Sequence, residues 1–144
     1  MRYGTLLAGL LLGGLAHADD SVVRENLLGT WQLQSGDTHE SWSLESDGAS
    51  LRVTRKDDGK VSLDVECKPD GSMCKGVDEG KKVQVTMYFN GAALVQIETR
   101  NQEVIKRRFE LDGHGDLTID LNPLNEPAKR HSLQLVRLAK VADR

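Results

Sequence analysis

Hydrophobic and polar residues alternate along most of the chain, in short stretches separated by glycine, asparagine or aspartate. The stretch 60–67 places valine, leucine and cysteine at one parity and mostly charged residues at the other. This alternation puts the apolar side chains on one face of a β-strand. The same pattern recurs at 29–34, 40–45, 51–55, 81–89, 92–100, 104–111, 117–121 and 131–138. The sequence therefore predicts nine strands and an all-β domain.

Short turn sequences join these stretches. Residues 57–59 read Asp-Asp-Gly, and Asn90-Gly91 is typical of a two-residue hairpin because both residues tolerate a positive φ. Strands joined in this way form a single antiparallel meander. A meander of eight to ten strands leaves no exposed edge when it closes into a barrel, so we expect a closed β-barrel. A two-sheet sandwich remains the alternative, and residues 20–28 are expected to be a short helical lead-in.

The N-terminus has the three parts of a secretory signal peptide. Arg2 gives a positive start, residues 6–15 are apolar, and Ala16-His17-Ala18 is a small-x-small cleavage site. The apolar run is shorter than the roughly 20 residues that span a bilayer. We expect cleavage after Ala18, a periplasmic or secreted location, and no membrane anchor in the mature chain. The predicted organisation is a signal peptide at 1–18, a lead-in at 19–27, a barrel at 28–138 and a tail at 139–144.

Charge and aromatic content narrow the range of partners. The whole chain has a net charge of −3. Removal of residues 1–18 takes away Arg2 and makes the remaining chain more negative by one charge. Mild acidity argues against nucleic acid or anionic lipid as a partner. Beyond residue 18 the aromatic residues are too few to stack bases or sugars and also fill a core. They are Trp31, Trp42, Tyr88, Phe89 and Phe109.

The two cysteines, Cys67 and Cys74, suggest a disulfide because their number is even and the chain is predicted to be exported. The segment between them contains Pro69-Asp70-Gly71, a turn sequence that brings the two ends together. Their six-residue gap fits neither a redox pair nor zinc-ligand spacing. We therefore expect a structural disulfide.

The remaining reactive residues form no catalytic or metal-binding pattern. The histidines after residue 18 are His39, His114 and His131, which lie at predicted turns or strand ends without ligand spacing. No serine has the context of a nucleophile elbow. We therefore expect a non-enzymatic protein with no metal and no cofactor.

Arg107 is the one candidate ligand-binding residue. It shares a strand face with Ile105, Phe109 and Leu111, which should point inward. An inward arginine is costly unless it is paired or near water. Two interpretations stay open: Arg107 holds a carboxylate or phosphate of a ligand, or it pairs with a neighbouring acid or lies at the barrel mouth. The orientation of the neighbouring strand, which carries Gln96, is not decided by its pattern.

The segment Leu28-Gly29-Thr30-Trp31 resembles the Gly-x-Trp motif of the lipocalins, which are calycin-type barrels. In that family the motif lies on the first strand after a short helix, and a basic residue near the end of the last strand packs over the tryptophan. Arg137 occupies the matching place. The chain most resembles small bacterial exported proteins with lipocalin-like domains, an uncharacterised subgroup. The resemblance implies a lipocalin-like barrel in which Trp31 and Arg137 form a structural pair by stacking.

Two functional hypotheses follow. The first is an exported barrel that binds a small apolar or amphipathic ligand. Such barrels hold one small ligand or are filled by their own side chains, and a drug-sized ligand needs a cavity of at least about 300 Å³. The alternative is a periplasmic protein-binding module, such as a protease inhibitor, that acts through residues 19–26 or an exposed hairpin. The sequence does not predict the oligomeric state.

Overall fold

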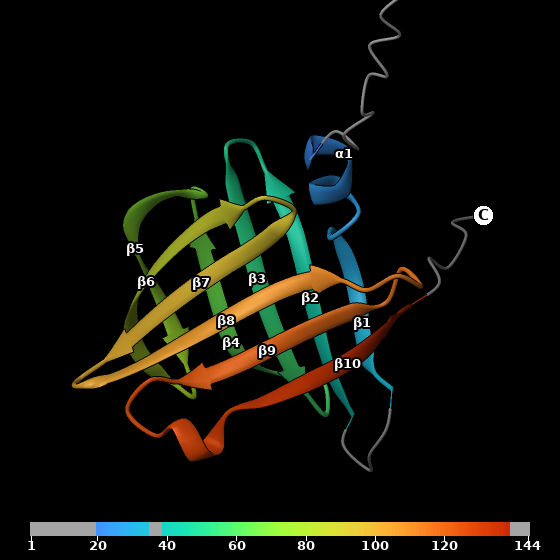
Figure 1. The fold of residues 1–144 in the computed structure, drawn as a ribbon. Helices are drawn as coiled ribbons and strands as arrows, with labels where there is room; N and C mark the ends of the chain where they lie inside the picture. The colour runs from blue at the N-terminus through green and yellow to red at the C-terminus, as the bar shows by residue number, and fades with distance from the viewer. Residues whose placement is uncertain (1–19, 35–38, 139–144) are drawn as a thin grey trace, which may run out of the picture.

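The strands close into one barrel. The computed structural model describes residues 20–34 and 39–138. Within them each strand pairs antiparallel with the next, and the last strand pairs with the first (Figure 1). The elements are α1 (Asp20–Glu25), β1 (Gly29–Leu33), β2 (Glu40–Asp47), β3 (Ser50–Asp57), β4 (Lys60–Cys67), β5 (Asp70–Asp78), β6 (Lys81–Asn90), β7 (Ala93–Arg100), β8 (Glu103–Leu111), β9 (Leu117–Pro123), η1 (Pro127–Lys129) and β10 (His131–Arg137). The predicted closed meander is confirmed, and the sandwich alternative is wrong.

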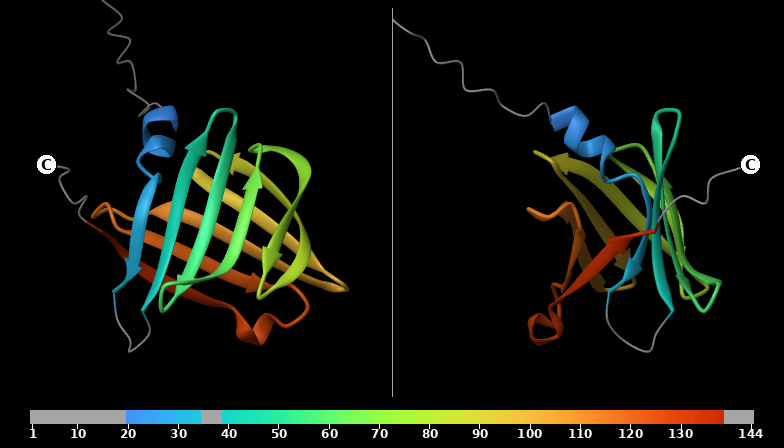
Figure 2. Two further views of the ribbon diagram at one scale, coloured as in Figure 1. Left: turned by 180° about the vertical axis from the view of Figure 1, so that it is seen from behind. Right: turned by 90° about the vertical axis from the view of Figure 1, so that its right-hand side faces the viewer.

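The short helix α1 lies against one end of the barrel, beside the start of β1, as Figures 1 and 2 show from three sides. We call this end the α1 end and the opposite end the far end. The expected helical lead-in is thus present. The predicted signal peptide at 1–18 and tail at 139–144 lie outside the described residues. In the described part of the chain, no helix has the length and apolar character needed to cross a bilayer.

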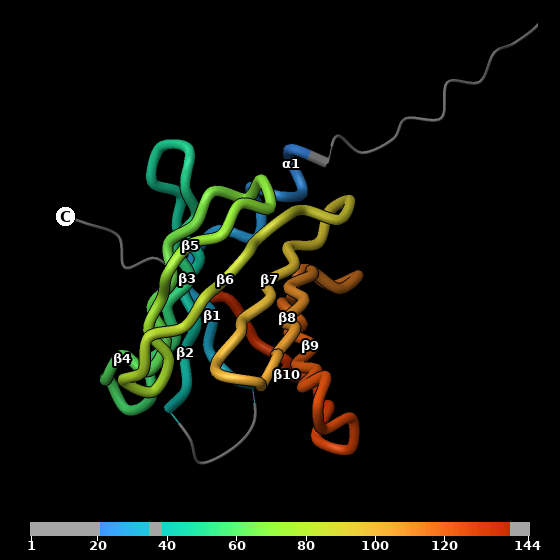
Figure 3. The backbone as a smooth tube through the Cα atoms, turned by 90° about the vertical axis from the view of Figure 1, so that its left-hand side faces the viewer, coloured from blue at the N-terminus to red at the C-terminus, as the bar shows by residue number. Residues whose placement is uncertain are grey.

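The described residues form ten strands where the alternation predicts nine, because the pattern gives only a turn at Pro69-Asp70-Gly71 and no strand at 70–78. β5 lies between β4 and β6 in the barrel wall. Figure 3 shows it beside β6, on the side of the barrel that faces the viewer. Its inward positions near the far end are Gly76 and Asp78, so it lacks the apolar alternation that marks the other strands. Gly76 is required because a Cβ there would lie 2.6 Å from the Val65 side chain.

The barrel interior is filled largely by its own side chains. Trp42 and Phe109 meet edge to face, with ring centroids 5.8 Å apart. The buried core residues come from every strand except β5, and together with these rings they form a packed core. The buried core comprises Leu27, Trp31, Trp42, Leu44, Val53, Leu63, Val65, Cys67, Val83, Val85, Met87, Leu94, Phe109, Leu117, Ile119, Leu121 and Leu135.

Reduction of the disulfide is expected to lower the melting temperature while the β structure persists at room temperature. Cys67 and Cys74 are joined by a disulfide between β4 and β5, and the bond closes a ring of eight residues. In the chain-entropy model so small a ring contributes about 2.5 kcal/mol. Circular dichroism melts with and without a reductant measure the shift. Complete unfolding on reduction would show that the bond holds the fold together.

Candidate functional site

The segment that joins α1 to β1 is fixed by Trp31 and Arg137. The fully buried Trp31 donates its indole N–H to the Leu27 carbonyl at 3.0 Å. The Arg137 guanidinium lies 4.2 Å from the Trp31 ring and donates to the Leu28 carbonyl at 2.7 Å and to the Asn26 carbonyl. The structure therefore places Trp31 and Arg137 together at the α1 end, where their hydrogen bonds hold residues 26–28 at the base of the helix.

Gly29 makes this arrangement possible. Its φ of +135° lies outside the range that side-chain-bearing residues favour. A Cβ at this position would also lie 2.5 Å from Nη1 of Arg137. The glycine of the Gly-x-Trp motif therefore provides both the backbone conformation and the space that the arginine needs.

An apolar pocket of about 160 Å³ lies beneath α1. Its size matches the roughly 150 Å³ cavity that holds one benzene molecule in another protein. It is smaller than the 300 Å³ or more of a typical drug-sized site. The pocket therefore suits a compact apolar group or the end of an alkyl chain. Its lining is formed by Arg24, Glu25, Leu27, Leu28, Leu44, Ser46, Leu51, Phe89 and Leu94.

Arg24 connects α1 to the opposite rim of this pocket. Its Nε donates to the Gly91 carbonyl in the β6–β7 turn at 2.9 Å. Its guanidinium also lies 4.4 Å from the centre of the Phe89 ring, within the range of a cation–π contact. Trp31 and Arg137 thus hold the base of the helix, and Arg24 connects the helix to the rim across the pocket.

Larger hollows lie among solvent-facing side chains. One of about 610 Å³ beside β1 includes the exposed Glu45, Arg137 and Leu138 in its lining. Another, of about 410 Å³ on β4 and β5, is lined mainly by charged residues such as Lys75 and Lys82. Neither combines an apolar lining with cover from α1, so the pocket beneath α1 is the stronger candidate.

Arg107 points inward, as its strand face predicted, but its partners belong to the protein itself. Its Nη1 donates to Glu98 Oε1 at 2.9 Å and to Gln96 Oε1 at 3.0 Å, and its Nη2 donates to Asp78 Oδ2 at 3.3 Å. All four residues are almost fully buried. The pairing interpretation therefore describes Arg107, and the proposed ligand-holding role has no support because Arg107 does not line the pocket.

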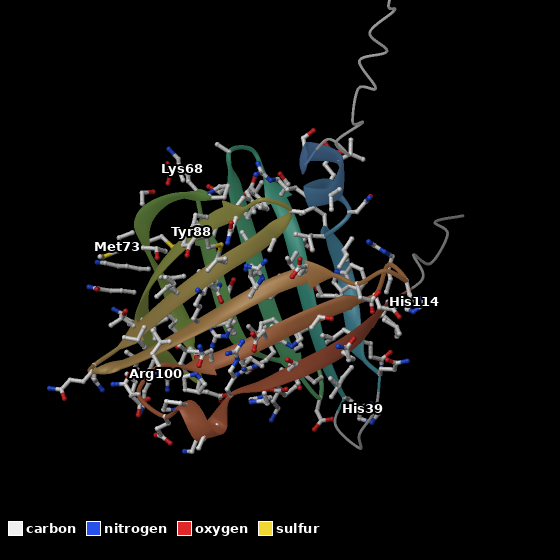
Figure 4. All side chains as sticks on the ribbon, viewed as in Figure 1. His39, Lys68, Met73, Tyr88, Arg100 and His114 are labelled. Atoms are coloured by element: carbon white, nitrogen blue, oxygen red, sulfur yellow. A yellow bond between two sulfur atoms is a disulfide. The ribbon has the colours of Figure 1, made fainter. Side chains whose placement is uncertain are left out.

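This buried polar cluster, defined as Asp78, Gln96, Glu98, Arg100 and Arg107, extends toward the far end. Arg100 donates to Asp78 Oδ2 at 2.8 Å. Figure 4 places Arg100 at the end of the barrel opposite α1. Arg55 borders the cluster, 3.5 Å from Asp78 and 2.8 Å from the exposed Glu79.

The two buried carboxyls of this cluster have oppositely shifted pKa values. Burial alone would raise the pKa of Asp78, but a hydrogen bond with Glu98 and the charges of the nearby arginines hold that pKa below its ordinary value. Burial, reinforced by Asp78, raises the pKa of Glu98 in spite of Arg107. Asp78 is therefore the carboxyl that more readily carries the negative charge in this cluster.

The histidines lie apart on the surface. His39, His114 and His131 are exposed, and Figure 4 shows His39 and His114 at separate places outside the barrel. Among the described residues no group of three His, Cys, Asp or Glu side chains is arranged to hold a metal ion.

Sequence reasoning missed the pocket, and it expected an acidic partner for Arg107 without identifying Asp78 or Glu98. One usable signal was the shared parity of Leu94, Gln96 and Glu98 on β7, which the competing parity of Val95 and Ile97 obscured. Asp78 had no such signal because its strand was not predicted. The pocket itself combines α1 with distant strands, and no local pattern indicates that arrangement.

The comparisons support the fold. No protein-family model matches the chain, and no curated protein matches it significantly. Similar solved structures include the REP1-NXSQ fatty acid transporter, at 16% identity and a TM-score of 0.66, covering 80% of this chain and 98% of that one. Fatty-acid-binding protein 1 of Echinococcus granulosus has 12% identity and a TM-score of 0.67, covering 80% and 99%.

A third similar structure is the Schistosoma mansoni fatty acid binding protein in complex with arachidonic acid. It has 14% identity and a TM-score of 0.68, covering 81% of this chain and 99% of that one. At such identities the similarity concerns the arrangement of the strands. The chain therefore shares the closed antiparallel β-barrel fold of these solved structures.

Proposed function

We propose that this protein is an exported, non-enzymatic barrel that binds a small apolar or amphipathic molecule beneath α1. The observation that carries the proposal is the pocket of about 160 Å³, in which six of the nine lining residues are leucine or phenylalanine. Burial of an apolar group against such a surface is favourable by roughly 25 cal/mol per Å² removed from water. The shared fold with proteins described as binding or transporting fatty acids agrees with this class of ligand.

The size of the pocket limits the ligand. Trp42, Phe109 and their neighbours occupy the barrel centre, so a long alkyl chain has no room to pass through it. The ligand therefore inserts an apolar portion of about six carbons, by analogy with the benzene-sized cavity. A polar end of an amphipathic ligand would lie at the rim, where Arg24 and Ser46 are found.

The helix acts as the cover of this site. Its base is held by the contacts of Trp31 and Arg137 with residues 26–28. Its contact across the pocket is made by Arg24 with the Gly91 carbonyl and the Phe89 ring. Ligand entry then requires release of the Arg24 contacts, while the base of α1 stays in place. The contacts of Arg24 with the Gly91 carbonyl and the Phe89 ring also favour this proposal over an inhibitor that acts through residues 19–26.

Filling the pocket is expected to abolish binding. In a calorimetric titration with hexanoate, the protein should bind saturably, and Leu51→Trp should weaken binding at least tenfold because the indole occupies the ligand's space. Leu124→Trp is the matched control, since Leu124 is exposed and lies outside the pocket lining. Tight binding retained by the Leu51 variant, or no saturable binding of hexanoate by either protein, would count against the site.

Export is the second part of the proposal and is tested separately. The short apolar run and the Ala16-His17-Ala18 site favour removal of residues 1–18. N-terminal sequencing of the protein isolated from its own cells should therefore begin at Asp19. Retention of Met1 in a membrane fraction would contradict this expectation.

A further inference from the structure

Four polar atoms in the buried polar cluster have no hydrogen-bond partner among the described residues. They are Gln96 Nε2, Glu98 Oε2, Arg100 Nε and Arg107 Nε. Buried polar atoms are rarely left without a partner, because removing them from water without replacement is costly. Hydrogen bonds of 2.8–3.3 Å through Arg107 and Asp78 join the side chains that carry these atoms, and Glu98 Oε2 has only a long ion-pair contact of 3.5 Å with Arg100 Nη2. Their common location calls for a shared partner.

We propose that the buried polar cluster is an internal water-binding site. The cluster presents three donor nitrogens and one carboxylate oxygen without a hydrogen bond. A water molecule accepts two hydrogen bonds and donates two, and internal water is stable when it has two to four polar partners. More than one water molecule, bound among Gln96, Glu98, Arg100 and Arg107, therefore satisfies the groups that the protein leaves without a hydrogen bond.

The charge of the cluster favours water over an ion. Arg55, Arg100 and Arg107 face three acids, Asp78, Glu79 and Glu98, so the formal charges of the cluster and its border balance when all three acids are ionised. A balanced cluster offers no net attraction to a metal cation or to a small anion. A neutral molecule that both donates and accepts hydrogen bonds is the partner that such a site recognises.

The strand neighbours of these side chains leave water as the remaining polar partner. Gln96 pairs in register with Met87 on β6 and with Arg107 on β8, and Glu98 pairs with Val85 on β6 and Ile105 on β8. Apart from Arg107, which belongs to the cluster, these neighbours are apolar and cannot satisfy the unpaired atoms. Arg100 is the cluster member at the far end, and its side chain is 20% exposed to solvent. Water would enter from that end, on the opposite side from the pocket beneath α1.

The inward face of β7 separates the two sites. Leu94 lines the apolar pocket, and Gln96, Glu98 and Arg100 follow at alternate positions toward the far end. The barrel is therefore apolar at the α1 end and hydrated at the far end. This inference does not depend on the proposed ligand, because the water site and the pocket have no lining residue in common.

Long-lived internal water is measurable in solution by oxygen-17 relaxation dispersion. The wild type should contain at least one such molecule, and Gln96→Met should contain fewer, because the thioether replaces an amide donor with an apolar group of similar length. Met87→Leu is the control; this neighbour of Gln96 lies outside the cluster, and its variant should keep the wild-type count. An absence of long-lived water in the wild type, or an unchanged count in the Gln96 variant, would overturn the proposal.

A high-resolution crystal structure of the wild type provides a test that does not depend on any variant folding. Ordered water within hydrogen-bond distance of at least two of the four unpaired atoms supports the proposal. Direct pairing of these atoms with one another or with other side chains, with no ordered water between them, overturns it.

Discussion

Replacement of Trp31 by alanine is expected to lower the free energy of unfolding by about 3–5 kcal/mol, the range for large buried aromatic residues. Trp31 has no exposed surface, and its indole N–H is bonded to the Leu27 carbonyl. The substitution removes the ring, leaves that carbonyl without its donor and takes away the surface on which Arg137 stacks. Chemical denaturation of the two proteins measures the difference.

Two further variants make the Trp31 experiment specific. Trp31→Phe keeps an aromatic ring but loses the N–H donor, so its loss should be clearly smaller than that of the alanine variant. Val61→Ala changes an exposed side chain and should alter stability by no more than about 0.5 kcal/mol. A loss below about 1 kcal/mol for Trp31→Ala would mean that the first strand and α1 do not depend on this contact.

Replacement of Arg107 by methionine should be similarly damaging, lowering the free energy of unfolding by about 3–5 kcal/mol at neutral pH. The variant leaves two buried carboxyls, Asp78 and Glu98, without the guanidinium that bonds to both. Arg108→Met is the matched control on the same strand. Its side chain is 36% exposed and pairs with the exposed Glu110, so its removal should change stability by no more than about 0.5 kcal/mol.

The loss at Arg107 should also depend on pH. The pKa of Asp78 is lower in the folded protein than that of an ordinary carboxyl. Such a group stabilises the folded protein at pH values above the ordinary carboxyl pKa, and this stabilisation is lost as the pH falls through the folded-state pKa. In the variant that contribution is weakened, and protonation of the two buried carboxyls offsets their loss of Arg107. The difference between the two proteins should therefore shrink on acidification. A difference that is the same at neutral and acidic pH would contradict the ion-pair account.

Most of the barrel was predictable because its strands alternate between a filled interior and solvent. The alternation at 60–67 and 81–89, together with turns such as Asn90-Gly91, is a local property, and β4 and β6 appear where these patterns lie. β5 departs from the pattern for a physical reason. The inward position 76 holds a glycine because the neighbouring Val65 leaves no space for a side chain. The inward position 78 accommodates an aspartate because arginines from other strands neutralise its charge.

The candidate site was predictable only in part, because it depends on contacts between distant segments. The alternation around Arg107 correctly placed that side chain inside, and the resemblance at Gly29-Thr30-Trp31 indicated the contact with Arg137. The pocket arises from the packing of α1 over the rims of β3 and β6, where Leu51 and Phe89 lie. No periodicity near either residue indicates that a helix will cover it.

A crystal structure of the mature protein grown with hexanoate would locate the ligand. We expect the alkyl chain to lie beneath α1 in contact with Leu51, Phe89 and Leu94, while Trp42 and Phe109 keep their edge-to-face contact in the barrel centre. An alkyl chain that displaces these rings from the centre, or that binds only in the hollow beside β1, would refute binding beneath α1.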